Sequence, residues 1–400
     1  MTIAPLAGIR VLDFGEVWAG PLLGVYLGDF GAEVIQVVSV SRAAVQATAG
    51  MASEPGPIAY SSVGRNRKAI TLDPTNPAGQ EIFQRLVAVS DIVFDNFSPR
   101  AARKLGIDFE RLHDVNPRII VCSMSAAGQT GPWSDLLTYG PSLTALYGIK
   151  SLLGYAGESR IQEDVADLDP TAATYAFIAV LAALRARERS GEGQFIDMAQ
   201  GEAGLASLAE AFLEYSLTGR ELGPTGNRNR RMAPHGIYPT VGDDRWISIT
   251  VDSEVAWHAL CSELGGTTLA NDDLFATMFR RMGNQDALDA EIGALTVARD
   301  AEELTERLQA VGVAAYPVLD SFGVIANDQL AFRRAGYAVD APGISAEQVV
   351  NPTPWRMAVS PPTVYSPARP LGADNDYVFD TILGLSLKER ADLQARGAFG

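Results

Sequence analysis

The sequence predicts an α/β protein in which a doubly wound, Rossmann-like large domain is joined to a smaller α+β domain. Short apolar runs alternate with helical patterns along the first half of the 400 residues, which favours a parallel sheet covered by helices on both faces. A hairpin pattern followed by helical patterns begins near residue 236, which indicates a second unit.

The N-terminal elements form one βαβ pattern. Residues 8–14 are a short apolar run that ends before Gly15, which is typical of a buried strand. Residues 19–30 have helical spacing with Pro21 in the first turn, and residues 32–38 follow as a second buried strand. The order strand, glycine-bearing turn, helix, strand indicates parallel pairing.

The alternation continues to about residue 217. In chain order we expect a helix at 77–90, a strand at 91–95, a helix around 99–114, a strand at 118–125, a helix at 170–188, a strand at 194–198 and a helix at 201–217. The helix at 170–188 is long and rich in alanine, with Pro170 in its first position and Asp169 at its cap.

The second half of the chain predicts the smaller domain and two connectors. Residues 236–251 alternate as two strands around the turn VGDD, helical patterns run from about 253 to 312, and 313–318 is typical of a strand. Residues 331–370 hold seven prolines and little periodicity, and a final helix starts near Asp376. We therefore expect the N-terminal part of the large domain at 1–217, a linker at 218–236, the small domain at 237–330, an extended return linker at 331–370 and the C-terminal part of the large domain at 371–400.

Composition and charge exclude several classes of function. The net charge of −16 argues against a nucleic acid or a membrane as partner, because no basic surplus is available to neutralise phosphates. Cys122 and Cys261 lie far apart in apolar contexts, so they predict neither a disulfide framework nor a metal site. The sequence shows no signal-peptide pattern and no run of about 18 apolar residues, so we expect a cytoplasmic protein.

Few motifs point to chemistry by themselves. Gly15 and Gly20, in the turn GEVWAGP, are five apart and do not form a dinucleotide fingerprint, although this turn belongs at the sheet edge where ligands bind. The three histidines adjoin neither a serine-nucleophile nor a zinc motif. Asp169, in the acidic stretch EDVADLDP, is either an ordinary helix cap or a carboxylate nucleophile kept ionised by a helix N-terminus. The residues alone leave both interpretations open.

A resemblance that covers nearly the whole chain favours the second interpretation. The segment PLAGIRVLDFGEVWAGPLLGVYLGDFGAEVIQV resembles the opening of the class III coenzyme A transferases, the family of formyl-CoA, carnitine and bile-acid CoA-transferases. Similar segments follow in order: GRNRKAITLD, DNFSPRAARKLGID, NPRIIVCSMSAAGQTGP, AALRARERSGEGQFIDM, APHGIYPTVGDDRWISI and ARPLGADNDYVFDTILGLS.

The resemblance implies an acyl-CoA:carboxylate CoA-transferase with a covalent mechanism. The family's nucleophilic aspartate lies about eighteen residues before the second arginine of an AALxxR-type helix. Counting back eighteen from Arg187 gives Asp169, with Asp167 as the alternative. In the family this carboxylate passes through an aspartyl acyl anhydride and an aspartyl-CoA thioester. Coenzyme A is therefore expected as part of an acyl-CoA substrate, with a carboxylic acid as co-substrate and no permanently bound cofactor.

The resemblance also implies positions that bind coenzyme A. Val17, Trp18 and Ala19 match residues beside the pantetheine and the thioester, and Tyr139 matches an active-site tyrosine. The positions matched on the nucleotide side are Leu72, Asn96, Ala101, Lys104 and Leu105, with Arg42 as a looser candidate for the phosphates.

Three departures from the family pattern bear on the substrate. The second strand ends Gln36-Val37-Val38 in place of Lys-Val-Glu, Trp18 replaces a glutamine or a small residue, and Gly140 replaces an acidic residue. These departures argue against formyl or oxalyl groups and favour a bulkier, partly apolar acid.

Two other functions and one assembly also follow from the resemblance. An acyl-CoA racemase of the same fold would need a second acid/base, typically a histidine shortly after the GQxGP segment, and WSDLLTYGPSL holds none. A catalytically silent subunit of a heteromeric transferase is the other alternative. The family fold implies a homodimer of two interlocked, ring-like chains, for which 218–236 and 331–370 are long enough to serve as ring segments.

Overall fold

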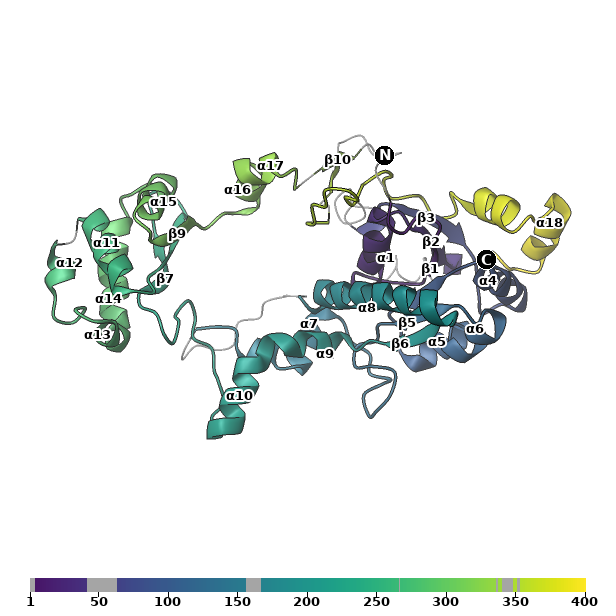
Figure 1. Ribbon diagram of the computed structural model, residues 1–400, viewed down its shortest axis with the longest axis horizontal. Coiled ribbons are helices and arrows are strands. Elements are labelled where there is room, and N and C mark those ends of the chain that lie inside the picture. Colours follow the sequence, from purple (N-terminus) through teal and green to yellow (C-terminus); the bar gives the residue numbers. More distant parts are fainter. Residues whose placement is uncertain are drawn as a thin grey trace. The chain divides into compact units, whose positions relative to one another are not determined.

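The computed structural model describes residues 4–41, 63–155, 167–265, 267–335, 337–339, 348–350 and 353–400. The chain divides into two compact units, one formed by Met1–Ile149, Glu163–Ser216 and Ala331–Gly400 and the other by Lys150–Gln162 and Leu217–Leu330 (Figure 1). Residues from both ends of the chain therefore belong to the larger unit. Of the expected site residues, Arg42 lies outside the described residues.

The larger unit is built on a six-stranded parallel sheet with the order β3-β2-β1-β4-β5-β6. Its strands are β1 (Arg10–Asp13), β2 (Glu33–Val38), β3 (Arg67–Thr71), β4 (Ile92–Asp95), β5 (Ile120–Ser123) and β6 (Gln194–Asp197). The predicted doubly wound parallel sheet is confirmed, and the strand order reverses between β1 and β4. Ligands of such sheets bind at the carboxyl edge beside this switch point.

Helices cover both faces of this sheet (Figure 1). One apolar cluster joins Leu12 and alternate strand residues to α4 (Pro77–Ala88), α5 (Pro99–Leu105), α6 (Phe109–Val115) and α18 (Leu387–Ala395). A second cluster joins Val11 and the intervening strand residues to α1 (Ala19–Asp29), α8 (Leu168–Ser190) and α9 (Gln200–Leu205). Because neighbouring strand residues point to opposite faces, each strand contributes to both cores.

The structure corrects several predicted elements of the larger unit. The expected helix around 99–114 is two helices, because Gly106 adopts a left-handed conformation at φ 68° and ends α5. Strand β3, the short helix α7 (Gly140–Leu146) and the turn η1 (Ile149–Ser151) have no predicted counterpart. The helix predicted at 201–217 is divided into α9, the 3₁₀ turn η2 (Ala206–Leu208) and α10 (Ala209–Thr218). The final helix near Asp376 is a π-helical segment, η3 (Tyr377–Ile382), followed by α18.

The C-terminal return segment packs along α1. Trp355 stacks on Phe177 of α8, with ring centroids 5.6 Å apart, and also contacts Tyr26 of α1. Thr353 donates a hydrogen bond to Asp29, the last residue of α1. Within the region predicted as an extended linker, β10 (Tyr337–Val339) pairs antiparallel with β11 (Gln348–Val350).

The smaller unit contains an antiparallel sheet of β7 (His235–Pro239), β8 (Trp246–Thr250) and β9 (Ala314–Pro317). The predicted hairpin is confirmed by the pairing of β7 with β8. Its helices are α11 (Glu254–Leu264), α12 (Thr267–Asn271), α13 (Met278–Gly283), α14 (Gln285–Thr296), α15 (Ala301–Ala310) and α16 (Ser321–Ile325). Helices α10 (Ala209–Thr218) and α17 (Asp328–Phe332) span the boundaries between the units. Trp257 and Leu260 of α11 pack with Ile247 of β8 in its core. No helix of the described part of the chain is long and apolar enough to cross a membrane.

Candidate active site

The turn between β1 and α1 is held from two sides at the carboxyl edge of the sheet. Asp13 accepts a hydrogen bond from the Gly15 N–H at 2.7 Å and forms a buried ion pair with Arg67. Asn96, the residue after β4, accepts the Glu16 N–H at 2.8 Å and donates to the Glu16 carbonyl at 2.9 Å. These bonds fix the backbone of the turn against the end of β4 and, through Asp13, against Arg67, the first residue of β3.

The glycines and Val17 of this turn have unusual backbone geometry. A Cβ atom on Gly20 would lie 2.4 Å from the Gly15 Cα, so the two glycines make a contact that no larger residue permits. The spacing of five residues therefore closes a tight turn. Val17 adopts φ 62°, a left-handed conformation that is rare for a β-branched residue, and it is 62% exposed. Backbone strain of this kind clusters at ligand and active sites.

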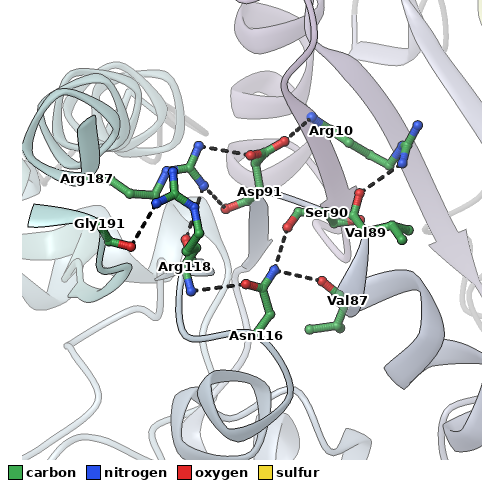
Figure 2. A network of polar contacts seen from close by, with 9 residues as sticks. All are labelled: Arg10, Val87, Val89, Ser90, Asp91, Asn116, Arg118, Arg187 and Gly191. Carbon is green, nitrogen blue, oxygen red and sulfur yellow. Dashed lines mark hydrogen bonds and ion pairs between the residues drawn. The ribbon is translucent and has the colours of Figure 1, made fainter. Parts of the chain in front are cut away.

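The far end of α8 is anchored at the opposite, amino edge of the sheet by Arg187 (Figure 2). Its guanidinium pairs with Asp91, with Nη2 and Oδ1 2.9 Å apart, and donates to the carbonyls of Asp91 and Arg118 at 3.3 and 3.1 Å. Asp91 and Arg118 precede β4 and β5. Asp169 lies eighteen residues before Arg187. That distance is roughly five turns at 3.6 residues per turn, so both side chains emerge from the same face of α8, about 27 Å apart.

Asp169 is the second residue of α8, and only 9% of it is exposed. The expectation that it caps a helix starting at Pro170 is wrong, because the helix begins at Leu168, whose buried side chain packs into the unit. The Asp169 carboxylate instead accepts the backbone N–H of Ala19, the first residue of α1. Asp167 occupies the N-cap position, is exposed, and makes no side-chain cap hydrogen bond.

The electrostatic surroundings of Asp169 combine two opposing influences. Burial raises the pKa of the Asp169 carboxyl, and the hydrogen bond from the Ala19 N–H lowers it, with a net upward direction. The first turns of α1 and α8 both present N–H groups that favour a negative charge nearby. A carboxylate that is desolvated but held by one hydrogen bond suits nucleophilic attack.

Asp169 lines a cavity of about 140 Å³ in the larger unit. The walls come from the turn after β1, the residues after β4 and β5, the start of α7 and the first residue of α9. The lining includes Glu16, Val17, Asn96, Ser125, Tyr139, Asp169 and Gln200. Among the described residues that line it, none is a histidine, lysine or arginine.

The structure gathers part of the predicted site at this cavity. Val17, Asn96 and Tyr139 line it, and the Ala19 N–H binds the carboxylate of Asp169. Trp18, at the N-cap position of α1, is 40% exposed and is not one of its lining residues.

The remaining predicted positions lie around the β3 end and α5. Leu72 and Leu105 are buried in one apolar cluster, Ala101 packs against it, and Lys104 is exposed on α5. The side chain of Leu72 is fully buried, so only its backbone is accessible to a ligand.

Sequence reasoning missed Ser125 and Gln200, which line the cavity beside Asp169. Ser125 lies two residues after β5, and Gln200 begins α9. Both sites follow parallel strands at the carboxyl edge, and that position was the available signal. In the described part of the chain, no cluster of three or more His, Cys, Asp or Glu side chains is arranged to hold a metal ion.

Comparisons with known proteins show the family of this chain. The model of CoA-transferase family III matches residues 6–375. The protein belongs to CoA-transferase family III. Members of this family use CoA thioesters as substrates, so this transferase is an enzyme of acyl-CoA chemistry.

Relatives of this family III transferase match it along nearly its full length. It is 34% identical to the succinyl-CoA–D-citramalate CoA-transferase of Chloroflexus aurantiacus, over 98% of this chain and 97% of the relative. It is 31% identical to the alpha subunit of succinyl-CoA–L-malate CoA-transferase from Chloroflexus aurantiacus, over 98% of this chain and 92% of the relative. The crystal structure of a CaiB/BaiF family protein from Brucella suis superposes with a TM-score of 0.84 at 28% identity, covering 97% of this chain and 99% of that one.

Proposed function

We propose that this enzyme moves coenzyme A from an acyl-CoA to a carboxylic acid and that Asp169 is its nucleophile. The observation that carries the proposal is the buried Asp169 carboxylate in the cavity wall, held by the N–H of Ala19. Asp167, the alternative nucleophile, is exposed and is not among the residues that line this cavity. The relatives named for succinyl-CoA-dependent transfer support the same reaction class.

In the proposed reaction, a carboxylate oxygen of Asp169 attacks the carbonyl carbon of the thioester. The carbon–sulfur bond breaks, CoA leaves as the thiolate, and an aspartyl acyl anhydride remains. The thiolate then attacks the aspartyl carbonyl, which forms an aspartyl-CoA thioester and releases the donor acid. The acceptor carboxylate attacks this thioester, which expels the CoA thiolate and forms a second anhydride, between Asp169 and the acceptor. The thiolate then attacks the acceptor's acyl carbon, which gives the new CoA ester and releases the Asp169 carboxylate.

Both covalent intermediates would hydrolyse if water reached them. The low exposure of Asp169 limits that access, and Tyr139, which is half-exposed at the cavity, is positioned to cover a bound acyl group. The strained turn at Val17 brings the start of α1 to the Asp169 carboxylate. The N–H groups at this helix start favour the carboxylate anion, which forms again each time Asp169 is released from a covalent intermediate.

Replacing Asp169 with asparagine tests this assignment, with Asp167→Asn as the matched control on the same turn. We expect Asp169→Asn to lose at least about a thousandfold in CoA transfer, because it removes the covalent route, and Asp167→Asn to stay within a few-fold of wild type. Succinyl-CoA is the first donor to assay, with a panel of carboxylic acids as acceptors and mass spectrometry to detect new CoA esters. Unchanged transfer by Asp169→Asn, or a selective loss in Asp167→Asn, would exclude Asp169 as the nucleophile.

For the assembly we propose a homodimer of interlocked chains, formed through the two segments that connect the units. The relative named as an alpha subunit makes a heteromer with a related chain the alternative. Multi-angle light scattering of the purified protein, followed by a CoA-transfer assay of the same sample, distinguishes the two. A homodimer has twice the mass of the chain and is active by itself, whereas a heteromeric enzyme would be inactive as an isolated chain. A folded, active monomer would contradict both.

A further inference from the structure

The hydroxyl of Ser125 is a buried polar group without a hydrogen-bond partner in the described part of the protein. Ser125 is 2% exposed, and its Oγ atom is inaccessible and unbonded. The same residue lines the cavity that contains Asp169. Leaving a buried hydroxyl unpaired costs about 1–3 kcal/mol, so such groups are uncommon in folded proteins.

Several hydrogen bonds hold the backbone and side chains around Ser125. Its carbonyl accepts the Gln200 N–H at 2.9 Å, and the Gln200 side chain donates to the Met124 carbonyl at 2.6 Å. Ser123, two residues earlier and equally buried, donates its hydroxyl to Asp95 at 2.7 Å. These bonds hold the segment around Ser125 in place, and its hydroxyl, which has no partner among the described residues, can bond with a group that enters the cavity.

We propose that the Ser125 hydroxyl donates a hydrogen bond to the reacting carbonyl oxygen of the acyl group. This inference rests on the proposed function, because attack by Asp169 makes that oxygen negative. The Asn96 and Gln200 side chains beside the cavity each use one amide N–H, toward the Glu16 and Met124 carbonyls, whereas the Ser125 hydroxyl has no bond among the described residues. The Ala19 N–H is held by Asp169 itself. A hydroxyl can rotate about its Cα–Cβ bond to reach a developing charge, and such donors stabilise acyl-transfer transition states.

The test is Ser125→Ala, with Thr240→Val as the matched control. Thr240 is 4% exposed, also has an unbonded buried hydroxyl, and belongs to the smaller unit. Both substitutions remove an unsatisfied group, so we expect both to leave the melting temperature unchanged or slightly higher. Ser125→Ala alone is expected to lower kcat by about a hundredfold with little change in KM, because the bond strengthens only in the transition state. The assay uses the best donor of the wild type, starting with succinyl-CoA.

Three results would overturn the role of Ser125. The first is an unchanged kcat. The second is a rise in KM at constant kcat, which would indicate that Ser125 binds the acyl chain. The third is a lowered melting temperature that accounts for the loss of activity, which would indicate a structural role of the hydroxyl. Each leaves the proposed function intact as long as Asp169→Asn is inactive. Active Asp169→Asn protein would instead remove the proposed function, whatever Ser125→Ala does.

Discussion

The anchoring of α8 by Arg187 makes a quantitative prediction about stability. Arg187 is 7% exposed, and its guanidinium makes three hydrogen bonds to Asp91 and Arg118 (Figure 2). Replacing Arg187 with methionine keeps the aliphatic stem but removes the guanidinium. The neighbouring Arg185 provides a matched control, because its ion pair with Glu188 is exposed on both sides.

The expected cost follows from the partners left behind. Loss of a hydrogen bond between charged groups costs about 1.5–3 kcal/mol, and the Arg118 carbonyl also loses the donor that Arg187 supplied. The Asp91 side chain keeps the Arg10 N–H at 2.8 Å and its side chain is 27% exposed, so the cost stays below that of breaking a fully buried pair. We expect Arg187→Met to lower the free energy of unfolding by about 2–3 kcal/mol.

Urea denaturation followed by circular dichroism at fixed protein concentration measures this difference. Arg185→Met is expected to change the free energy of unfolding by less than about 0.5 kcal/mol, as is usual for exposed ion pairs. CoA transfer by folded Arg187→Met should stay within a few-fold of wild type, since the anchor lies about 27 Å from Asp169 along the helix. Equal stability of the two variants would refute the view that Arg187 anchors α8.

Three further predictions concern the site. Burial raises the pKa of Asp95 to about 6, so the native state holds its proton more tightly than the unfolded chain, and stability falls as pH rises through that value. Asp95→Asn should therefore be more stable than wild type at pH 8, by up to about 3 kcal/mol, with the advantage vanishing near pH 4 in urea denaturation. Gly20→Ala should lower the free energy of unfolding by about 1–3 kcal/mol and reduce CoA transfer at least tenfold, because the start of α1 and the Ala19 N–H must shift. The control is Gly283→Ala, where the added methyl group meets open space, and neither stability nor transfer should change. The raised pKa of Asp169 predicts that kcat/KM declines on the acid side at a higher pH than an ordinary aspartate would give, and a decline at or below the ordinary value would contradict it.

The parallel sheet could be predicted because it depends on local periodicity, whereas Asp169 was singled out by the resemblance to the family. The spacing of eighteen residues between Asp169 and Arg187 has a physical basis, since five helical turns bring both residues to one face of α8. The helix start was misplaced because Leu168 is drawn into the core by contacts from other elements. Strand β3 was missed because it begins with two charged residues, Arg67 and Lys68, and has only a short apolar run. Arg67 is buried through its ion pair with Asp13, which is distant in the sequence.

The role of Ser125 could not be predicted from the sequence. Its distinguishing property is the lack of a partner for one hydroxyl, and this depends on how α8, α9 and the end of β5 pack. Ser123 has the same residue type in the same segment, yet its hydroxyl is bonded to Asp95. The sequence pattern treats the two serines alike, and only the fold distinguishes them.

Trapping the covalent intermediate tests the central claim most directly. The protein is incubated with an acyl-CoA, treated with hydroxylamine, digested and mapped by tandem mass spectrometry, since hydroxylamine converts an aspartyl anhydride or thioester to a hydroxamate. We expect a hydroxamate on Asp169 that depends on acyl-CoA and is absent from Asp169→Asn. A hydroxamate on Asp167 or another carboxylate, or efficient transfer with none formed, would contradict it.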